Sequence, residues 1–399
     1  MIRHLFTLMW NRRRANALLI VEMFLAFVVL FAVGSIGTTL WRNYRQPLGF
    51  TYTDVWQLNF TTGQQPRAEQ FGTLQQLLAR LRSTPGVEEV ALSASNTPFS
   101  FNDSRSSIEM KDEKGKTKRS INDVNVYNVG PELPKVLGLK VVAGRWFDKS
   151  DVASGANPPV VIDERMQRAM YPDGESAVGK TLPFDKKEQR IIGVVSAYRT
   201  DGELQEPLSS VLWQILPTDT TFLPQSILLK VRSGSGAALE KQLADDVRRI
   251  GPGWSSTIKP LTEMHRSQMQ QLLTRPILLG SMSLFLLLNV ALGLFGVLWL
   301  NISRRRGEIG VRRAMGATAG NISRQVLGEI LVLTTFGLVL GLLVAAQFPL
   351  LGVFSVQPAV YLTAMLLAAG LLYLLATVCA LYPSRLAAGI RPAVALREE

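Results

Sequence analysis

The sequence predicts a membrane protein in which four transmembrane α-helices hold a large α+β extracytoplasmic domain, inserted between helices 1 and 2. The prediction starts from three stretches that almost lack charge. Residues 15–40 contain Glu22 as their one charged residue, and residues 276–303 and 330–384 contain none. A bilayer core requires about 20 apolar residues per helix, so the first two stretches each fit one helix and the third fits two.

Proline and glycine near residues 349–358 divide the third stretch into two helices with a turn between them. The predicted helices cover residues 17–40, 277–303, 329–348 and 359–382. Buried helices of a soluble protein would have a polar face, and these stretches have none. A cleaved signal peptide remains the alternative for the first stretch. Its apolar run is longer than the 7–15 residues of a signal core, which favours a retained anchor.

Arginines in the short segments predict the orientation, because short basic loops face the cytoplasm. The predicted lead 1–16, loop 304–328 and tail 383–399 contain three acids against these arginines: Arg3, Arg12, Arg13, Arg14, Arg304, Arg305, Arg306, Arg312, Arg313, Arg324, Arg385, Arg391 and Arg397. We therefore expect an inner (plasma) membrane protein with both termini cytoplasmic and residues 41–276 outside.

The same arginines flank apolar spans, so most of the net charge of +12 suits contact with anionic membrane lipid rather than with nucleic acid. The lead 1–16 predicts an amphipathic helix in the plane of the membrane, with Ile2, Leu5, Phe6 and Met9 on one face.

Residues 41–276 show mixed patterns that predict an α+β domain. An amphipathic helix is expected at 67–82, where Phe71, Leu74, Leu77, Leu78 and Leu81 share one face. Further helices are expected at 131–137, 163–171 and 236–250. Strands are expected at 87–93, 141–146, 160–162, 190–195 and 227–231, and on both sides of a charged turn at 112–115.

The sequence contains little that predicts catalysis. It has no nucleophile elbow and no HExxH, so we expect no enzyme activity, no metal site and no cofactor in this chain. Cys379 falls in the fourth predicted helix, where a packing role is expected, and His265 is expected at a surface or interface. The acid pairs Asp163–Glu164 and Asp245–Asp246 are expected on solvated helix faces.

Residues 303–333, SRRRGEIGVRRAMGATAGNISRQVLGEILVL, contain the most informative pattern. A basic run leads into a short helix, Gly316 is placed to end that helix, and Thr318 is placed to cap a second one. Two interpretations remain open. The helix anchors on the membrane surface, or it docks a cytosolic partner through Glu308 and the arginines.

This stretch resembles the motif of the MacB/FtsX/LolC family of ABC transporter permeases, roughly R-x-x-E-I-G-[IV]-R-x-A-x-G-A with a later Glu. The matching residues are Arg305, Glu308, Ile309, Gly310, Val311, Arg312, Ala314, Gly316, Ala317 and Glu329. Residues 158–198 resemble the extracytoplasmic domain of MacB-like members. The tail resembles the family's ending through Pro383, Arg385, Pro392, Ala395, Leu396 and Arg397.

The resemblance implies a permease dimer on a dimer of cytosolic ABC ATPases. The ATPases bind ATP and Mg²⁺, and the loop with Arg313 and the matching residues couples to them. Their movement would pass to the outer domain (mechanotransmission), for export or extraction of a peptide, lipid or small molecule. Residues 174–181, GESAVGKT, fit the spacing of a Walker A motif, but they lie in the stretch that resembles the extracytoplasmic domain, so the ATPase is expected on a separate polypeptide. A single copy of the loop motif implies pairing with a second permease copy, in a homodimer or a heterodimer. The resemblance leaves open whether a periplasmic adaptor or an outer-membrane channel is a further partner.

The membrane-embedded acids are Glu22 and Glu329. Glu329 is expected at the cytoplasmic interface. For Glu22 an interfacial role, or one at the helix N-terminal dipole, is favoured over contact between helices. Three other functions are weighed: an FtsX-like regulator of a periplasmic cell-wall hydrolase, a receptor without an ATPase, and a membrane-anchored enzyme. The loop motif argues against the receptor, and the lack of a catalytic constellation argues against the enzyme.

Overall fold

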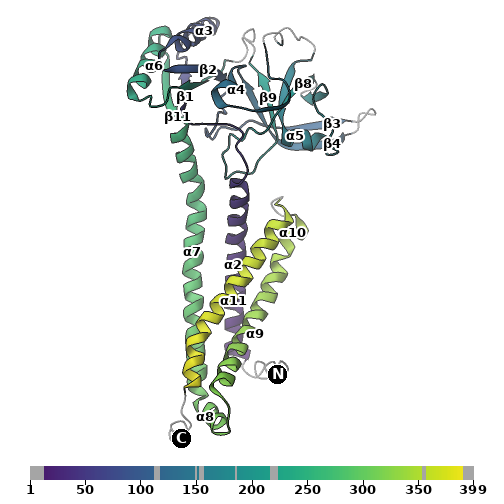
Figure 1. Cartoon of the computed structure of the whole chain (residues 1–399), viewed down its shortest axis with the longest axis vertical. Helices are drawn as coiled ribbons and strands as arrows, with labels where there is room; N and C mark the ends of the chain where they lie inside the picture. The colour runs from purple at the N-terminus through teal and green to yellow at the C-terminus, as the bar shows by residue number, and fades with distance from the viewer. Residues whose placement is uncertain are drawn as a thin grey trace. The chain divides into compact units, whose positions relative to one another are not determined.

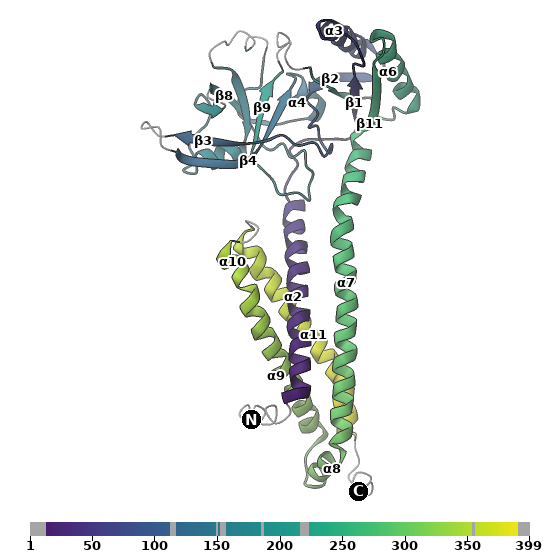
Figure 2. The same ribbon diagram turned by 180° about the vertical axis from the view of Figure 1, so that it is seen from behind.

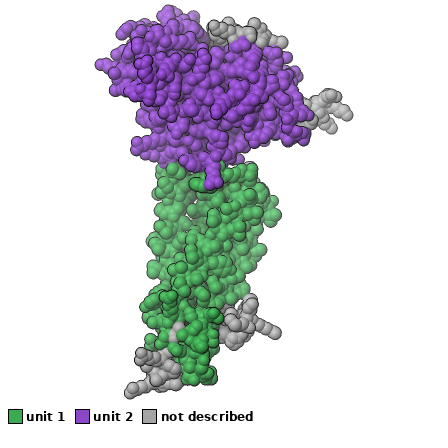
Figure 3. Space-filling model, in the orientation of Figure 1, with its two compact units in different colours: residues 1–42, 273–399 green, residues 43–272 purple. Residues whose placement is uncertain are grey.

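A computed structural model describes residues 13–111, 117–148, 151, 157–184, 187–215, 223–352 and 356–389. The chain forms two compact units. One comprises Met1–Arg42 with Leu273–Glu399, and the other comprises Asn43–Leu272. Figure 3 colours the two units separately. The predicted lead helix before residue 13, the turn at 112–115, and Pro392 to Arg397 lie outside the described residues.

The first unit is helical, and four of its helices are long and apolar enough to cross a membrane (Figure 1). This finding confirms the predicted four-helix membrane architecture. The helices are α2 (Arg13–Tyr44), α7 (Leu261–Arg304), α8 (Arg306–Ala314), α9 (Ala319–Ala345), α10 (Gln347–Leu351) and α11 (Pro358–Ala388).

Two of these helices are longer than their apolar segments. Helix α7 begins at Leu261, well before the predicted residue 277, and it contains Pro276. Helix α9 begins at Ala319 rather than near residue 329, because Thr318 caps it. Hydropathy locates the part of a helix that suits a bilayer, and it does not predict the polar turns that extend the helix on either side.

Close packing around α2 forms the core of the helical unit. Leu19, Met23 and Phe27 are buried there. Helix α9 meets this face through two glycines. A Cβ on Gly337 would lie 2.5 Å from Cβ of Met23, and one on Gly341 would lie 2.3 Å from Cδ1 of Phe27. Small residues at this spacing allow two membrane helices to approach closely, and Figure 2 shows α2 beside α9.

The second unit is built on an 11-stranded sheet with the order β11-β1-β10-β2-β4-β9-β6-β8-β5, in which β3 pairs with β4 and β7 with β8. The strands are β1 (Val55–Thr61), β2 (Val87–Ser93), β3 (Arg105–Lys111), β4 (Thr117–Val129), β5 (Val141–Gly144), β6 (Pro159–Asp163), β7 (Thr181–Phe184), β8 (Lys187–Val195), β9 (Ser210–Gln214), β10 (Ser226–Val231) and β11 (Ser255–Pro260). Its helices are α3 (Arg67–Ser83), α4 (Leu133–Leu137), α5 (Glu164–Met170) and α6 (Ala237–Ile250).

The sheet divides into two halves, because β2 and β4 share a single residue pair, Ser93 with Val129. Helices α3 and α6 pack against β1, β2, β10 and β11 through one apolar cluster. Helix α5 packs against the other half. The α+β prediction is confirmed, including the helix at 67–82. Strands β1, β7, β9 and β11 were not predicted.

Two acids expected on solvated faces are buried instead. Asp246 is 2% exposed, and its Oδ2 lies 3.0 Å from Nε of Arg80. Asp163 caps α5 by accepting a 2.7 Å hydrogen bond from the backbone N–H of Met166, and burial raises its pKa to about 6. A run of adjacent acids does not reveal which element will cover it, so the solvated interpretation was wrong for both residues.

Candidate functional site

The loop between α7 and α9 folds as the short helix α8 with defined ends. Gly316, at φ +100°, follows the last turn of α8, a conformation that glycine adopts without strain. The Oγ1 of Thr318 accepts a 3.3 Å hydrogen bond from the backbone N–H of Asn321 and caps α9. The predicted helix end at Gly316 and the predicted cap at Thr318 are both confirmed.

Five polar side chains form a closed ring between α8 and α9. Nη1 of Arg305 lies 3.0 and 3.1 Å from the two carboxylate oxygens of Glu329. Gln325 donates to Glu329 at 3.3 Å and accepts from Nη1 of Arg312 at 2.8 Å. Nη2 of Arg312 donates to Glu308 at 2.5 Å, and Oε2 of Glu308 lies 3.9 Å from Nε of Arg305. We call these residues the α8–α9 ring.

An apolar contact lies beside the ring. Ile309 is buried with Ile302 of α7, Ile322 of α9 and Ala387 of α11, and Gly310 is buried next to it. The face of α8 that contacts α7, α9 and α11 is therefore held by both apolar packing and charged contacts. Within this chain Glu308, Arg305 and Arg312 pair with one another and with α9; docking of a partner through them, one of the two interpretations of the sequence, stays a prediction.

The opposite face of α8 is open. Val311 is 42% exposed and Met315, just past the helix, is 75% exposed. Ala314 and Gly316 are exposed beside them, and Arg313 is half-buried. Positions 311, 314 and 315 are neighbours on a helical surface. They form a small apolar strip on the exposed side of α8.

Glu22 lies against α7 within the helical unit. A Cβ on Gly293 would lie 2.8 and 3.0 Å from its carboxylate oxygens, so a glycine leaves the space for this side chain. Helix α2 begins at Arg13, so Glu22 lies beyond the first turn. The effect of the helix dipole is confined to that first turn. The position of Glu22 therefore fits a contact between helices, which was the less favoured of the two predicted roles.

A second polar centre lies in the α+β unit, where α2 ends and α7 begins. Arg199 is buried and donates to five backbone carbonyls. Its Nη1 bonds those of Asn43 (3.2 Å) and Gln46 (2.8 Å). Its Nη2 bonds those of Gly202 (3.3 Å), Glu203 (3.0 Å) and Gln205 (2.9 Å). Asn43, in the last turn of α2, donates in turn to the carbonyl of Leu204 at 3.2 Å.

The same loop, residues 199–206, also contacts the first turns of α7. Nε2 of His265 lies 2.9 Å from Oε2 of Glu203, and its ring packs against Tyr52 and Phe99 with centroids 4.8 Å apart. His265 thus makes a partly buried side-chain contact with Glu203 within its own domain. The loop joins the end of one membrane helix to the start of the next, and no sequence pattern pointed to it.

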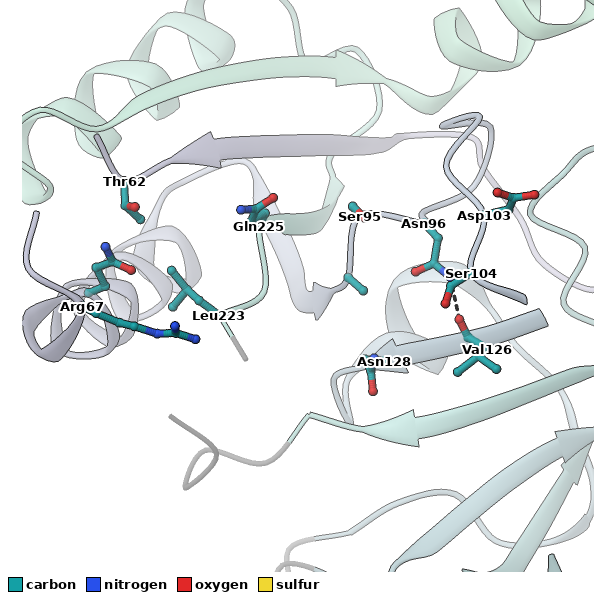
Figure 4. Close-up of a pocket in the computed structure, with 12 residues that line it drawn as sticks. Thr62, Arg67, Ser95, Asn96, Asp103, Ser104, Val126, Asn128, Leu223 and Gln225 are labelled. Atoms are coloured by element: carbon teal, nitrogen blue, oxygen red, sulfur yellow. Dashed lines mark hydrogen bonds between the residues drawn. The ribbon is translucent and has the colours of Figure 1, made fainter. Parts of the chain in front are cut away.

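A pocket of about 610 Å³ opens where the two halves of the sheet separate (Figure 4). Most polar groups that line it are neutral amides and hydroxyls, those of Thr62, Gln70, Ser95, Asn96, Ser104, Asn128 and Gln225, with Arg67 and Asp103 as the charged members. This lining suits hydrogen bonds to a polar ligand. No group of three or more metal-ligating side chains occurs among the described residues.

Comparison with known families decides the relationship. The family model for the MacB-like periplasmic core domain matches residues 17–246, more than half of the chain. The chain belongs to this MacB/FtsX-type permease family. The model for the FtsX-like permease C-terminal region matches residues 280–392, which include α8 and the ring. The protein is therefore a multi-pass membrane protein of the permease family.

Individual relatives agree over part of their length. The chain is 28% identical over 239 residues to the macrolide export ATP-binding/permease protein MacB of Neisseria meningitidis serogroup A, covering 57% of this chain and 35% of that one. It is 30% identical over 240 residues to the protein of the same name from Aggregatibacter actinomycetemcomitans, covering 57% and 36%. The chain thus spans about a third of the length of these relatives.

The chain also has a similarity to a solved structure. The crystal structure of the periplasmic region of MacB from Actinobacillus actinomycetemcomitans has a TM-score of 0.38 and 20% identity to this chain, covering 54% of it and 93% of the solved chain.

Proposed function

We propose that this protein is the permease subunit of an ABC transporter of the MacB/FtsX type. In this proposal a separate cytosolic ATPase dimer binds ATP and Mg²⁺, and two permease copies sit on it in the inner membrane with their termini and α8 in the cytoplasm. The observation that supports it most directly is α8: a short helix braced from behind by the α8–α9 ring and Ile309, with Val311, Ala314 and Met315 exposed.

A braced helix can transmit force, whereas a loosely held loop would absorb it. The ring bonds α8 to α9, and the cluster around Ile309 joins α8 to α7 and α11. A displacement of α8 by the ATPase would therefore reach three membrane helices through direct contacts. Beyond the membrane, loop 199–206 contacts both the end of α2 and the start of α7. We propose that this loop receives the movement in the outer domain, which is mechanotransmission in structural terms.

The task of the outer domain is the less defined part of the proposal. We propose export or extraction of a peptide, lipid or small molecule. The relatives named macrolide exporters give one example of such a cargo. The pocket between the halves of the sheet, with its neutral polar lining, would favour the polar portion of such a molecule.

The test measures whether an ATPase associates with the protein, and whether variants of the exposed α8 strip still stimulate ATP hydrolysis by that ATPase. The protein is purified in mild detergent from its native membrane, and an ATPase with a Walker A motif is sought in the eluate. Val311→Asp and Met315→Asp place charge on the open face of α8 without touching the ring. We expect each to lower stimulated ATP hydrolysis at least tenfold while insertion is unchanged. A carboxylate buried without a partner weakens an interface, and a loss of about 1.4 kcal/mol in binding free energy corresponds to a factor of about ten in affinity.

The matched control is Leu350→Asp, the same kind of change at a highly exposed residue of α10. It should leave stimulation as in the wild type. Unchanged hydrolysis in the Val311 and Met315 variants would remove α8 as the docking surface. A preparation that contains no ATPase, even after crosslinking, would instead favour a receptor.

A further inference from the structure

The loop of residues 96–104, which follows β2, holds two phenylalanines in the left-handed backbone region. Phe99 has φ +63° and Phe101 has φ +59°. This conformation is an outlier for a bulky side chain, because Cβ comes too close to the following carbonyl oxygen. Such strain persists only where the surroundings compensate for it, and it is concentrated at functional sites. We therefore ask what compensates for it at each residue.

Packing compensates for the strain at Phe99. The residue is 1% exposed, and its ring centroid lies 5.8 Å from that of Phe50, 5.3 Å from that of Tyr52 and 4.8 Å from that of His265. Its backbone N–H donates to the carbonyl of Thr200 at 2.8 Å. Burial of a whole aromatic side chain is a large stabilising contribution, so the fold itself explains why Phe99 is held in this conformation.

No such packing compensates for the strain at Phe101. The residue is 53% exposed, and its ring stacks on no aromatic ring among the described residues. If this position required only a left-handed turn, glycine or asparagine would adopt it with less strain. The fold therefore keeps an apolar ring in contact with solvent at a cost, which indicates that the ring itself has a use.

The ring of Phe101 lines a second pocket, of about 390 Å³, a volume in the range of small-molecule sites. Loop residues 99–102, strands β1 and β11 and the first turns of α7 form its wall. Lys259 and Glu263 add one charge of each sign, and neither side chain has a hydrogen bond or ion pair to a described residue. The other polar groups are neutral carboxamides and hydroxyls, those of Gln57, Asn59, Ser100, Asn102, Thr257 and Ser267.

Hydrogen bonds hold the loop in place on both sides. Nδ2 of Asn96 donates to the carbonyl of Val126 in β4 at 2.7 Å. Nε2 of Gln57 in β1 donates to Oγ1 of Thr97. A wall that is already ordered lowers the entropy lost when a ligand binds, so Phe101 is presented on a prepared surface.

We infer that this pocket binds a neutral saccharide, with Phe101 as the platform on which a sugar ring stacks. One face of a sugar ring consists of C–H groups that carry a slight positive charge, and the face of an aromatic ring is negative. The hydroxyls around the sugar ring both donate and accept hydrogen bonds, as do the carboxamides and hydroxyls of the wall. Lys259 can donate to further sugar hydroxyls, and Glu263 can accept from them.

This inference goes beyond the proposed function and does not depend on it. The residues that line the pocket lie between positions 57 and 267, all within the α+β unit. A saccharide would therefore bind whether or not an ATPase joins the protein. The larger pocket between the halves of the sheet differs, because its described lining contains no aromatic residue.

The test measures the binding of two neutral saccharides to the full chain. The probes are maltotriose and the disaccharide of N-acetylglucosamine, and the affinity is obtained by titration with saturation-transfer NMR. The protein is kept in lauryldimethylamine oxide, because a detergent with a sugar head group would compete. We expect at least one probe to bind the wild type. Phe101→Asn should weaken that binding at least about tenfold, and Phe101→Trp should retain it within about threefold.

Thermal stability separates a ligand platform from a residue that supports the fold. Asparagine tolerates the left-handed conformation, so Phe101→Asn should leave the midpoint of thermal unfolding unchanged or raise it by about 2–4 °C. Glu263→Ala should weaken binding about three- to tenfold. Glu109→Ala, at an exposed position of β3, is the matched control and should leave the affinity unchanged.

Three results would overturn the inference. If neither probe binds the wild type, or if trialanine binds and both saccharides do not, the ligand class is wrong. If Phe101→Asn binds the saccharide as tightly as the wild type, the sugar does not stack on this ring. If Phe101→Asn lowers the unfolding midpoint by several degrees, the ring supports the fold, and its exposure does not indicate a binding site.

Discussion

The α8–α9 ring and the Arg199 centre both join membrane helices to a loop, and they do so by different chemistry. The ring consists of two arginines, two glutamates and the neutral Gln325, and the side chains of Glu308 and Arg312 in it are 47% and 36% exposed. Arg199 is buried and donates to uncharged carbonyls. Water competes for the ring and is kept from the Arg199 centre. Ion pairs that remain in contact with solvent are worth little each, while a buried acceptor that loses its donor is costly.

The difference suits the positions of the two centres. In the proposed function α8 docks a moving partner, so it must be held in place and yet adjust, and several weak contacts that can exchange partners would allow that. In the same proposal the Arg199 junction passes movement into the outer domain and must not yield, and five bonds from one rigid, planar side chain would provide that stiffness. The two centres can therefore be distinguished by how much local stability each loses when one of its side chains is replaced.

The largest effect is expected from Arg199→Met. The variant fills a similar length of space and removes all five bonds, of which those to Asn43 and Gly202 are buried. A buried carbonyl left unpaired costs about 1–3 kcal/mol. We expect a loss of about 3 kcal/mol or more in local stability. Hydrogen exchange of loop 199–206 and of the last turn of α2 should rise about a hundredfold. Arg168→Met, on the exposed face of α5, is the control and should change exchange little. Equal protection in both variants would mean that the Arg199 bonds do not hold the junction.

A smaller effect is expected at another buried polar group of the same domain, Asp163. Its pKa is raised to about 6 by burial, against 3.8 for the exposed group. The folded domain therefore holds its proton more tightly than the unfolded chain between about pH 4 and pH 6. By linkage the free energy of unfolding falls as pH rises through that window. The difference of about two pKa units corresponds to about 3 kcal/mol, an order-of-magnitude figure.

Asp163→Asn keeps a side-chain oxygen for the cap of α5 and removes the titration. We expect the variant to be as stable as the wild type near pH 4.5 and more stable by about 1–3 kcal/mol near pH 7.5. Thermal unfolding in detergent, followed by tryptophan fluorescence at the two pH values, measures the difference. Asp173→Asn, at an exposed position, is the control. A pH profile of the Asp163 variant that parallels the wild type would show that this carboxyl titrates in its ordinary range.

Sequence patterns predicted what depends on spacing along the chain. Helix α3 was expected from Leu74, Leu77, Leu78 and Leu81, which recur on one helical face, and all four are buried. The ends of α8 and α9 were expected from Gly316 and Thr318. These features are local, because a glycine or a cap acts on its own turn of helix.

The same reasoning missed contacts between segments far apart in sequence. Arg305 and Glu329 both matched the family motif, yet nothing in the motif says that they bond each other. Asp246 was read as solvated because its partner, Arg80, lies on another helix. Arg199 follows a strand in an ordinary polar loop, and its role depends on carbonyls of residues 43–46. Gln325 could have been found, since it precedes Glu329 by four residues, the spacing of neighbours on a helix.

The smallest effect is expected from the α8–α9 ring, and it sharpens the comparison most. Glu329→Gln and Arg305→Gln should each lower local stability by about 1 kcal/mol or less, because both side chains keep some contact with solvent. The reversed pair Arg305→Glu with Glu329→Arg should recover part of that loss, giving a coupling energy of about 0.5–1 kcal/mol. Hydrogen exchange of residues 306–314 measures the stability, and stimulated ATP hydrolysis measures the function in the same variants. If stability and hydrolysis fall together and the reversed pair restores both, the ring holds α8 for docking. Losses as large as that of Arg199→Met would show that the ring is as rigid as the junction, and the distinction between the two centres would fail.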